Sequence, residues 1–507
     1  MDAKILSLEQ MAAKAAALKA GGQRLVLCHG TFDLMHLGHI RHLQRARAEG
    51  DCLLVTLTAD RFVSKGPGRP VFTEMLRAES LASLACVGYV AVVPEATAIS
   101  AILAIRPDVY VKGQDYQNGE QDITGNIVLE RNAVEGVGGR IFFTDEITFS
   151  STNLLNDHFD VFSPLTREYL RDFKKRYTGD RLVELVQGLS GLKVLVVGDA
   201  IVDEYCYTKP LGLTGKSGNI LATRFNTTEQ FAGGSLAIAN HLAEFCRGVT
   251  LAAGLGMDDR HEPFIRSKLS RGVSPVFFYF ENAPTLVKRR FVDEEMNKLF
   301  EVYYYDPQPL SPGLEEIICN WLRKNLPLYD AVVVPDYGNG FISKTMVEVL
   351  VEGAKYLAVN AQINSGNRGY HAITQYPRAD FVSLNEPEVR LAGHNRHDPI
   401  EVVATGLGRR IGADHFAITQ GVQGATMLDL SGGRSWLVPA LSTKVVDRIG
   451  AGDAFLSLAG LSLAGGLDGE VAAFVGSAAA ALDVQIVCNR GHVTPVGLYK
   501  YLTTLLK

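Results

Sequence analysis

Residues 25–39 read LVLCHGTFDLMHLGH, and this stretch decides the fold of the first part of the chain. Its first four residues are apolar, as in a buried strand, and the next segment repeats apolar residues with helical spacing at Leu37, Ile40 and Leu43. Further strand-like runs follow at Cys52–Leu57, Tyr89–Val93, Asp108–Lys112 and Ile141–Phe143. Their alternation with helix-length segments predicts an α/β domain with a parallel sheet and crossover helices.

Composition and charge exclude several classes of function. Of the 507 residues, 47% are hydrophobic and 21% are charged, which is typical of a globular protein. The net charge of -5 gives no basic field for nucleic acid and no polybasic membrane anchor. The seven cysteines form no C-x-x-C pair, which favours a reducing cytoplasm. The uncharged stretch Ala454–Leu467 is shorter than the ~18–20 residues of a membrane span, and lysines interrupt any signal-like N-terminal core.

A second α/β domain is expected to begin near Leu192. A strand over Lys193–Asp199 opens it, and further buried strands are expected at Ala331–Val334, Tyr356–Val359, Phe381–Leu384 and Phe416–Thr419. Residues 166–189 are charged with helical spacing and predict a helical connection. The predicted organisation is a first domain over residues 1–160, a helical linker over 161–190 and a second domain over 191–507.

The segment Gly30–His39 places two histidines at the start of a predicted helix. Gly38 lets a ligand approach the backbone closely, and the N–H groups of a helix N-terminus attract phosphates. His36 and His39 share one helical face and can both hydrogen-bond to one phosphoryl group. Because no carboxylate accompanies them at metal-binding spacing, the pattern favours phosphate over zinc.

The string GTFDLMHLGH resembles the nucleotidylyltransferase superfamily of glycerol-phosphate cytidylyltransferases and heptose-phosphate adenylyltransferases, over residues 24–156. KGPGRP at 65–70 resembles the family's basic loop, VKGQDY at 111–116 its base- and ribose-binding strand end, and SSTN at 150–153 its phosphate-binding closing segment. The resemblance implies a Rossmann-like domain in which the histidines stabilise the α-phosphate while pyrophosphate leaves. The implied catalytic residues are His36, His39 and Lys65, and the implied nucleotide-binding residues are Gly30, Thr31, Phe32, Asp33, Gly38, Lys112, Gly113, Asp115, Ser151 and Thr152. ATP is the expected nucleotide, and CTP stays open.

Near the C-terminus, residues 447–455 read DRIGAGDAF. Gly450 and Gly452 permit a tight turn whose N–H groups can cradle negative charge. Asp453 then stands at the start of the next helix, where a carboxylate can take the proton of a hydroxyl that attacks the γ-phosphate of ATP. A plain helix cap is the alternative for such a string in isolation.

Six motifs in order resemble the ribokinase/PfkB sugar-kinase family across residues 192–507. They are VGDAIVD at 197–203, AGGS at 232–235, Asn240, NEPE at 385–388, TQGVQG at 419–424 and the GAGD turn. The resemblance implies a ribokinase-like α/β fold that uses ATP and Mg²⁺, with Asp453 as the catalytic base. It also implies sugar-binding residues (Asp199, Asp203, Gly233, Gly234 and Asn240), ATP-binding residues (Thr419, Gly421, Gly424, Gly450, Ala451 and Gly452) and, mainly through water, magnesium-binding residues (Asn385 and Glu388).

The whole chain resembles bifunctional heptose-phosphate kinase/adenylyltransferases, with the order of the two domains reversed. DYGNG at 336–340 resembles that family's D-Y-x-x-G segment. Two departures stand out, since Asn360-Ala361-Gln362 replaces the family's Asp-Pro-Lys and Ile449 replaces a threonine. The segment from Asn360 to His371 is also rich in amides, which predicts altered substrate recognition.

The leading hypothesis is a bifunctional cytoplasmic enzyme of nucleotide-sugar synthesis. The second domain would phosphorylate a sugar or sugar phosphate with MgATP, and the first would transfer a nucleotidyl group to a sugar 1-phosphate and release pyrophosphate. Two alternatives stay open: a nucleotidylyltransferase with a weak or regulatory kinase-like domain, and a cytidylyltransferase for an alcohol phosphate such as glycerol 3-phosphate. The expected partners are small-molecule sugar phosphates and nucleotides, without nucleic acid or membrane, and a homodimer is the expected assembly.

Overall fold

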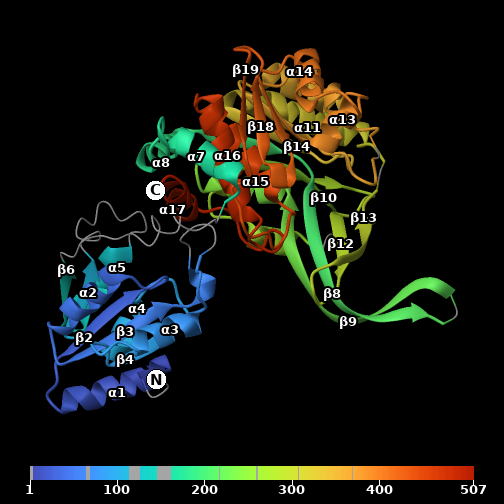
Figure 1. The fold of residues 1–507 in the computed structure, drawn as a ribbon. Helices are drawn as coiled ribbons and strands as arrows, with labels where there is room; N and C mark the ends of the chain where they lie inside the picture. Colours follow the sequence, from blue (N-terminus) through green and yellow to red (C-terminus); the bar gives the residue numbers. More distant parts are fainter. Residues whose placement is uncertain are drawn as a thin grey trace. The chain divides into compact units, whose positions relative to one another are not determined.

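The computed structural model describes residues 4–63, 69–113, 126–144, 162–215, 217–257, 261–306, 308–367 and 369–507 (Figure 1). The chain forms two compact units. Unit 1 comprises Met1–Ser163 with Tyr499–Lys507, and unit 2 comprises Pro164–Leu498. The predicted linker region from Pro164 onward is therefore grouped with unit 2.

Unit 1 contains a six-stranded sheet in the order β1-β4-β3-β2-β5-β6, in which every pair is parallel. Ile5 and Leu6 form an edge strand against Tyr89–Val93, so the first helix starts only at Leu8. The elements are β1 (Ile5–Leu6), α1 (Leu8–Ala20), β2 (Leu25–Gly30), α2 (Leu37–Arg47), β3 (Cys52–Thr58), η2 (Asp60–Phe62), α3 (Glu74–Ala82), β4 (Tyr89–Val93), α4 (Ile99–Ile105), β5 (Val109–Gly113), α5 (Asn126–Gly136) and β6 (Arg140–Thr144).

Both faces of this sheet are buried, which explains the continuous apolar runs in its strands. Along β2, Val26 and Cys28 pack into a core with residues of α2 and α3. The alternate residues Leu25 and Leu27 pack into a second core with residues of α1 and α4. Full burial of each such side chain contributes about 1.5–3 kcal/mol, so this sheet holds the start of α2 on a rigid support.

The main sheet of unit 2 has nine strands in the order β11-β10-β7-β14-β15-β16-β17-β18-β19. Strands β11 to β17 run parallel, and β18 and β19 continue the sheet in antiparallel fashion. These strands are β7 (Lys193–Val197), β10 (Gly248–Gly256), β11 (Val273–Phe280), β14 (Ala331–Asp336), β15 (Leu357–Ala361), β16 (Phe381–Asn385), β17 (His415–Thr419), β18 (Ala425–Asp429) and β19 (Arg434–Val438).

Helices of unit 2 cover this sheet, and α15 packs closely along α16 and α9. The charged segment at residues 166–189, predicted as a helical connection, forms α7 and α8. Phe173 of α7 stacks on Phe474 of α16, with ring centroids 4.2 Å apart. The helices are α7 (Pro164–Lys174), α8 (Gly179–Gln187), η5 (Gly188–Gly191), α9 (Ser235–Ala243), α10 (Glu262–Lys268), α11 (Pro312–Asn325), η6 (Leu326–Leu328), α12 (Lys344–Gly353), η7 (Ile373–Gln375), α13 (Glu386–Ala392), α14 (Ile400–Ile411), η8 (Gly421–Gln423), α15 (Ala451–Ala464), α16 (Gly469–Asp483) and α17 (Pro495–Leu505), whose end is grouped with unit 1.

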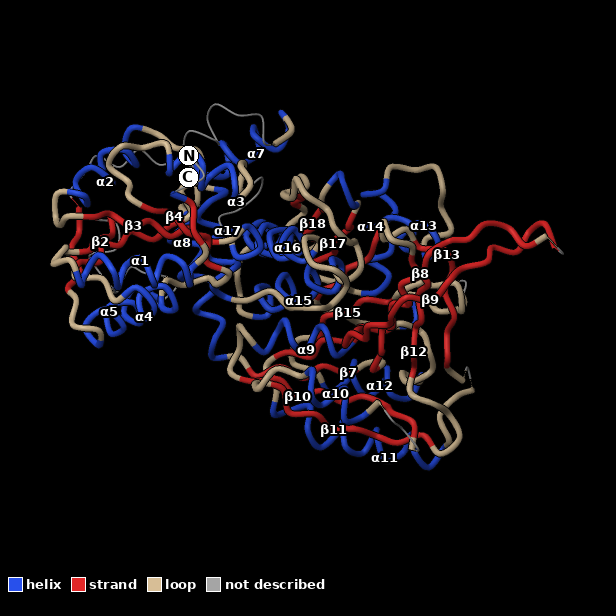
Figure 2. Tube along the Cα trace, turned by 90° about the horizontal axis from the view of Figure 1, so that it is seen from below, coloured by secondary structure: helices blue, strands red, loops and turns tan. Residues whose placement is uncertain are grey.

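A second, four-stranded sheet of unit 2 was not predicted from the sequence. Its order is β13-β12-β8-β9, from β8 (Ala200–Thr214), β9 (Ser217–Gly234), β12 (Leu286–Val292) and β13 (Lys298–Tyr304). Strand β12 pairs with β8 only from Ile201 to Tyr207, and beyond this point β8 and β9 extend as a two-stranded hairpin (Figures 1 and 2). We call this sheet the small sheet.

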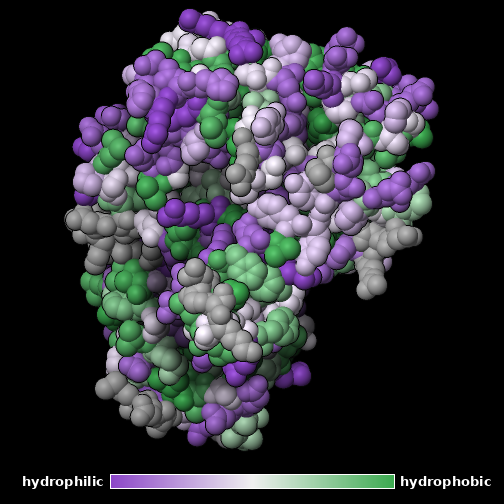
Figure 3. Space-filling view, turned by 90° about the vertical axis from the view of Figure 1, so that its right-hand side faces the viewer, coloured by the Kyte–Doolittle hydropathy of each residue, from purple (hydrophilic) through white to green (hydrophobic). Residues whose placement is uncertain are grey.

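No helix in the described part of the chain is long and apolar enough to cross a membrane. The face of the molecule in Figure 3 carries hydrophilic and hydrophobic residues interspersed with one another.

Candidate functional site

The N-terminus of α2 forms the first candidate site. His36 is its N-cap, and the backbone N–H of Gly38 donates to His36 Nδ1 at 3.1 Å. Because Nδ1 accepts this bond, the neutral ring carries its proton on Nε2. That atom is buried and has no hydrogen-bond partner among the described residues. Burial lowers the pKa of His36, so the ring is a neutral donor at neutral pH.

The second histidine of the predicted pair lies directly against the first. The rings of His36 and His39 stack with centroids 3.9 Å apart, and the Phe32 ring meets His39 edge-on at 5.8 Å. Phe32 and Leu34 have positive φ angles of 46° and 49°, which non-glycine residues rarely adopt. The strained turn between β2 and α2 therefore brings together the phosphate-binding residues that the sequence predicts.

Asp33 stabilises a neighbouring loop by accepting backbone hydrogen bonds. Its carboxylate accepts the backbone N–H groups of Val71 (2.9 Å) and Phe72 (3.2 Å). Arg69 was missed by the sequence analysis although it belongs to the quoted KGPGRP string. Its Nη2 is buried without a hydrogen-bond partner in the described ranges, and burial lowers its pKa while the charge of Asp33 opposes this effect. This guanidinium is a further candidate for binding phosphate.

Some of the other predicted site residues of unit 1 lie in the described part of the chain, and others lie outside it. The carbonyl of Thr31 accepts a bond from the buried Arg77, which also reaches Asp60. Lys112 Nζ lies 3.0 Å from Oε2 of the buried Glu130, at the end of β5 beside Gly113. Four predicted site residues lie outside the described residues: Lys65, Asp115, Ser151 and Thr152.

The N-terminus of α15 forms the second candidate site. Gly450, its N-cap, has a φ of +98°, and a side chain there would meet Asp483 Oδ2 at 2.6 Å, so only glycine suits this turn. Ala451, Gly452 and Asp453 form the first helical turn, whose N–H groups have no partner within the helix and can bind an anion. Asp453 Oδ1 accepts the hydroxyl of Tyr337 at 2.7 Å.

Asp453 has the protonation behaviour of a general base. Burial raises its pKa to about 7, and Asp203 adds to the shift, whereas the Tyr337 hydrogen bond and the charge of Lys288 oppose it. A base whose pKa lies near neutral pH can accept a proton in one step and release it in the next. Geometry and electrostatics therefore favour a catalytic carboxylate over a plain helix cap.

Four of the predicted sugar-binding residues lie together at the junction of β8 and β9. Asp203 forms an ion pair with Arg290, and a side chain at Gly233 would collide with Asp203 Oδ2. Gly234 pairs with Ala200, beside Asp199. Burial, together with the charge of Asp336, raises the pKa of Asp199 to about 6.

The fifth predicted sugar-binding residue, Asn240, makes contacts with another segment. Its Nδ2 donates to the carbonyl of Lys268 at 2.9 Å, and its Oδ1 accepts the N–H of Ser270 at 2.8 Å. The amide thereby holds the loop after α10.

A turn over residues 336–340 connects the sugar and base positions. Tyr337 donates to Asp453, and Asn339 Nδ2 lies 3.3 Å from Asp199 Oδ2. Asp336 anchors the turn by accepting the N–H of Gly338 at 3.1 Å and the hydroxyl of Tyr376 at 2.6 Å.

The amide-rich segment packs around this turn. Asn364 Nδ2 donates to the carbonyl of Tyr337 at 2.7 Å, and Asn367 Nδ2 donates to that of Gln362 at 2.9 Å. His371 Nε2 lies 2.7 Å from Asp336 Oδ1; although burial opposes it, this contact raises the pKa of His371. These side chains hold the turn that carries Tyr337 and Asn339, which gives the segment a positioning role that the composition did not indicate.

The two departures from the family pattern also acquire local contacts. Asn360 Nδ2 donates to the carbonyl of Ser383 at 2.7 Å, tying β15 to β16. Ile449 packs against the apolar cluster of Tyr205, Phe231 and Val292.

The predicted ATP-binding segments meet because Asn385 of β16 lies opposite Thr419 of β17. Asn385 and Glu388 form a capping box, each accepting the other's backbone N–H at 2.9 Å. Gly421 and Gly424 follow Thr419 in a turn with φ of +58° and +101°. Burial raises the pKa of Glu388 to about 7, and a nearby cation would lower this pKa because it stabilises the ionised carboxylate.

The side-chain oxygens of Asn385 and Glu388 fit Mg²⁺ that is bound through bridging water, since both side chains already accept hydrogen bonds from backbone N–H groups. Within the described ranges, no group of three or more His, Cys, Asp or Glu side chains could hold a metal ion directly.

Comparisons with known proteins match the two units to different families. Residues 192–487 match the family described as pfkB family carbohydrate kinase, and residues 27–155 match the cytidylyltransferase-like family. The crystal structure of phosphofructokinase-2 from Escherichia coli in complex with substrates and products is similar with a TM-score of 0.51 at 14% identity, covering 62% of this chain and 100% of that chain. This likeness confirms the expected ribokinase-like α/β fold.

Curated relatives match the N-terminal half. The bifunctional protein HldE of Geotalea uraniireducens is 41% identical over 160 residues, which is 30% of this chain and 31% of that protein. HldE of Helicobacter pylori is 47% identical over 119 residues, which is 23% of this chain and 25% of that protein. The chain thus spans less than a third of the length of these two relatives.

Proposed function

The chain belongs to the pfkB family of carbohydrate kinases, and from this premise we propose that unit 2 transfers the γ-phosphoryl group of ATP to a hydroxyl of a sugar or sugar phosphate. The observation that carries this proposal is the placement of Asp453. It is buried at the N-terminus of α15, bonded to Tyr337, and electrostatically coupled to Asp203. Base, anion-binding helix and polar sugar-binding residues belong to one site.

In this reaction the ionised Asp453 accepts the proton of the attacking hydroxyl as its oxygen bonds to the γ-phosphorus. The bond from that phosphorus to the β–γ bridging oxygen breaks, and ADP leaves. The N–H groups of Ala451 and Gly452 offset the negative charge on the transferred group. Thr419, Gly421 and Gly424 would line the ATP side, and Asn385 and Glu388 would hold Mg²⁺ through water, where the ion would screen the phosphate charges.

Unit 1 is proposed to transfer a nucleotidyl group from ATP, or CTP, to a sugar 1-phosphate. A phosphate oxygen of the acceptor attacks the α-phosphorus, and pyrophosphate leaves. His36 supports this assignment because its Nε2–H is a buried donor at the N-terminus of α2. Lys65, Asp115, Ser151 and Thr152 complete the proposed site by the family resemblance.

Together the two units would form a bifunctional enzyme of nucleotide-sugar synthesis. The name of the curated relatives that match part of this chain, bifunctional protein HldE, supports this combination. Because the chain spans less than a third of those proteins, the joint activity and its substrates are proposals for this chain.

The decisive experiment assays both reactions on the full chain. With MgATP and a panel of sugars and sugar 7-phosphates, we expect ADP formation that depends on one acceptor. With ATP or CTP and sugar 1-phosphates or glycerol 3-phosphate, we expect pyrophosphate release that depends on ATP and a sugar 1-phosphate. Pyrophosphate release without any acceptor-dependent ADP would instead favour a regulatory kinase-like unit, and preference for CTP with glycerol 3-phosphate would favour the cytidylyltransferase alternative.

A cytoplasmic location and a homodimer complete the proposal. All seven cysteines are free thiols, which suits a reducing compartment. The β8–β9 hairpin exposes Leu211, Leu213 and Phe225 at 65%, 66% and 62%, and two-stranded hairpins are marginally stable alone. A second copy packed on this hairpin would bury these side chains, which sedimentation of wild-type and Leu213→Lys chains would test.

A further inference from the structure

Lys288 lies on the face of the small sheet that carries the predicted sugar-binding acid Asp203. Lys288 pairs with Asp203 across β12 and β8 and with Tyr303 across β12 and β13. The residue is only 5% exposed. In the sequence it stands in the string KRR at 288–290, a pattern typical of a solvated charge run.

The ammonium group of Lys288 lies close to two aromatic rings. Its Nζ is 5.4 Å from the ring centroid of Tyr303 and 5.5 Å from that of Tyr337. The neighbouring Arg290 is bound to Asp203 and to Glu301. Among the described residues, no carboxylate lies within ion-pair distance of Lys288. A buried ammonium in this state retains hydrogen-bonding capacity that a ligand can satisfy.

The charges around Lys288 are those of the proposed sugar site. Burial lowers the pKa of Lys288, whereas the charges of Asp203 and Asp199 oppose this shift. Ionised carboxylates only accept hydrogen bonds, and an ammonium group only donates them. A sugar hydroxyl does both, so recognition of a hydroxyl is most complete where a carboxylate and an ammonium group converge.

We propose that Lys288 binds the acceptor in the kinase site, donating to hydroxyl oxygens whose protons are directed to Asp199 and Asp203. This inference rests on the proposed kinase function and adds the donor that the acidic residues lack. Lys288 acts by direct contact with the acceptor, and its charge also favours the ionised form of Asp453.

The effect of Lys288 on the pKa of Asp453 depends on the other groups around that carboxylate. The titratable and charged groups facing Asp453 are Tyr337, Asp203 of β8, Lys288 of β12, Glu388 of α13 and Asp483 of α16. Lys288 is the cation among these groups. Its removal therefore raises the pKa of Asp453 and shifts the acid limb of the kinase pH profile upward.

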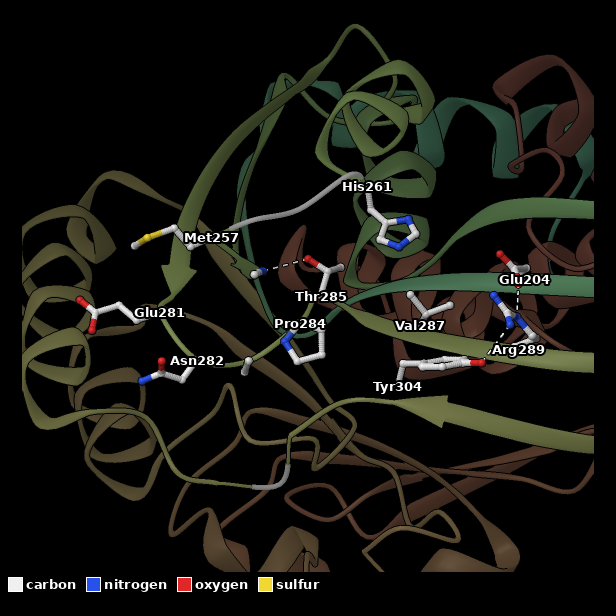
Figure 4. Close-up of a pocket in the computed structure, with 12 residues that line it drawn as sticks. Glu204, Met257, His261, Glu281, Asn282, Pro284, Thr285, Val287, Arg289 and Tyr304 are labelled. Atoms are coloured by element: carbon white, nitrogen blue, oxygen red, sulfur yellow. Dashed lines mark hydrogen bonds and ion pairs between the residues drawn. The ribbon is translucent and has the colours of Figure 1, made fainter.

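The adjacent residue Arg289 provides a matched control. Because side chains alternate along a strand, it projects from the opposite face of β12. It forms an ion pair with Glu204, and its Nη1 donates to the Tyr304 hydroxyl at 2.9 Å (Figure 4). These residues line a cavity of about 470 Å³ whose lining includes neither Lys288 nor Asp453.

The test compares wild type, Lys288→Met, Lys288→Arg and Arg289→Met as full chains. Kinase assays give KM for the acceptor, KM for ATP and the pH profile, and calorimetry measures acceptor binding with a non-hydrolysable ATP analogue. For Lys288→Met we expect acceptor KM to rise about 10- to 100-fold, since a charged hydrogen bond is lost. ATP KM and analogue affinity stay within about twofold, which also reports correct folding. Lys288→Arg restores the position of the acid limb, and Arg289→Met resembles wild type.

The failure of this inference differs from that of the proposed function. If wild type binds a sugar but forms no ADP, the proposed kinase function fails, while loss of that binding in Lys288→Met still supports the contact. If Lys288→Met binds the sugar as tightly as wild type, the contact is refuted. An equal loss of acceptor affinity in Arg289→Met would also refute it, because the effect would then come from the sheet as a whole.

Discussion

The N-termini of α2 and α15 use the same backbone feature with opposite side-chain chemistry. Each begins after a tight turn and exposes N–H groups at which we propose that a phosphate binds. At α2 the side chain is the neutral donor His36, whose pKa is lowered by burial. At α15 it is the carboxylate Asp453, whose pKa is raised by burial to about 7.

The proposed nucleophiles explain this difference. A sugar hydroxyl must lose its proton when it attacks the γ-phosphate, so the site at α15 needs a base. A phosphate oxygen is already largely ionised at neutral pH, since the second pKa of a phosphate monoester is about 6. The site at α2 therefore needs only donors that stabilise the transferred group.

The largest expected effect comes from Asp453→Asn. Removing a general base lowers kcat of the kinase by about 10²- to 10⁴-fold, because the hydroxyl proton has no acceptor. Pyrophosphate release by unit 1 should not change, and both activities are measured on the same preparation. Asp468→Asn is the matched control, since Asp468 is the N-cap of the neighbouring helix α16. Parallel loss of both activities in Asp453→Asn would show that the two sites are not independent.

The converse variant is His36→Asn, which keeps a side-chain acceptor at the N-cap. Losing one donor to the transferred group lowers nucleotidyl transfer by about 10²- to 10³-fold. ADP formation by unit 2 stays at the wild-type rate. His42→Gln serves as control, because His42 lies on the same helix and bonds Thr144 Oγ1 at 2.8 Å. Retention of full pyrophosphate release in His36→Asn would remove His36 from the proposed site.

The two sites also differ in their expected pH profiles. Asp453 acts when ionised, so kinase activity falls as pH drops through about 7, whereas the neutral state of His36 persists to lower pH. Tyr337→Phe removes a hydrogen bond that favours ionised Asp453, so the acid limb moves upward. The loss at pH 7 should stay below about tenfold, as for a single hydrogen bond. If the acid limb of the kinase pH profile does not move in Tyr337→Phe, Asp453 is not the group that titrates there.

The smallest expected effect concerns His371, which stabilises the turn at residues 336–340 through its contact with Asp336. A histidine whose folded pKa is raised adds stability below its unfolded pKa and loses it as pH rises through the folded value. His371→Gln should therefore lower the free energy of unfolding by about 1 kcal/mol at pH 6 and by less at pH 9. Urea unfolding followed by tryptophan fluorescence reports unit 2 alone, because Trp321 and Trp436 both lie there. An equal deficit at both pH values would contradict an ionic contact with Asp336.

The parallel strands were predictable from particular runs of sequence. Residues 25–28 and 52–57 are continuous apolar runs because both faces of their sheet are buried. The small sheet could not be predicted in this way. Its strands carry Asp203, Lys288 and Arg290 on a buried face, and these charges are typical of exposed segments until their pairing is known.

The sequence by itself determined the two turns that we propose to bind phosphate. Glycines, histidines and an aspartate at fixed spacing next to a strand or helix define local backbone geometry that needs no distant contact. Only the tertiary structure decided which partners tune them. Tyr337 on Asp453, His371 on Asp336 and Lys288 beside Asp203 are separated by 35 to 116 residues along the chain. Strand pairing brings Lys288 to Asp203, and packing of loops against α15 and β14 brings the other two pairs together. Burial then strengthens the effect of these charges on the pKa values of their neighbours.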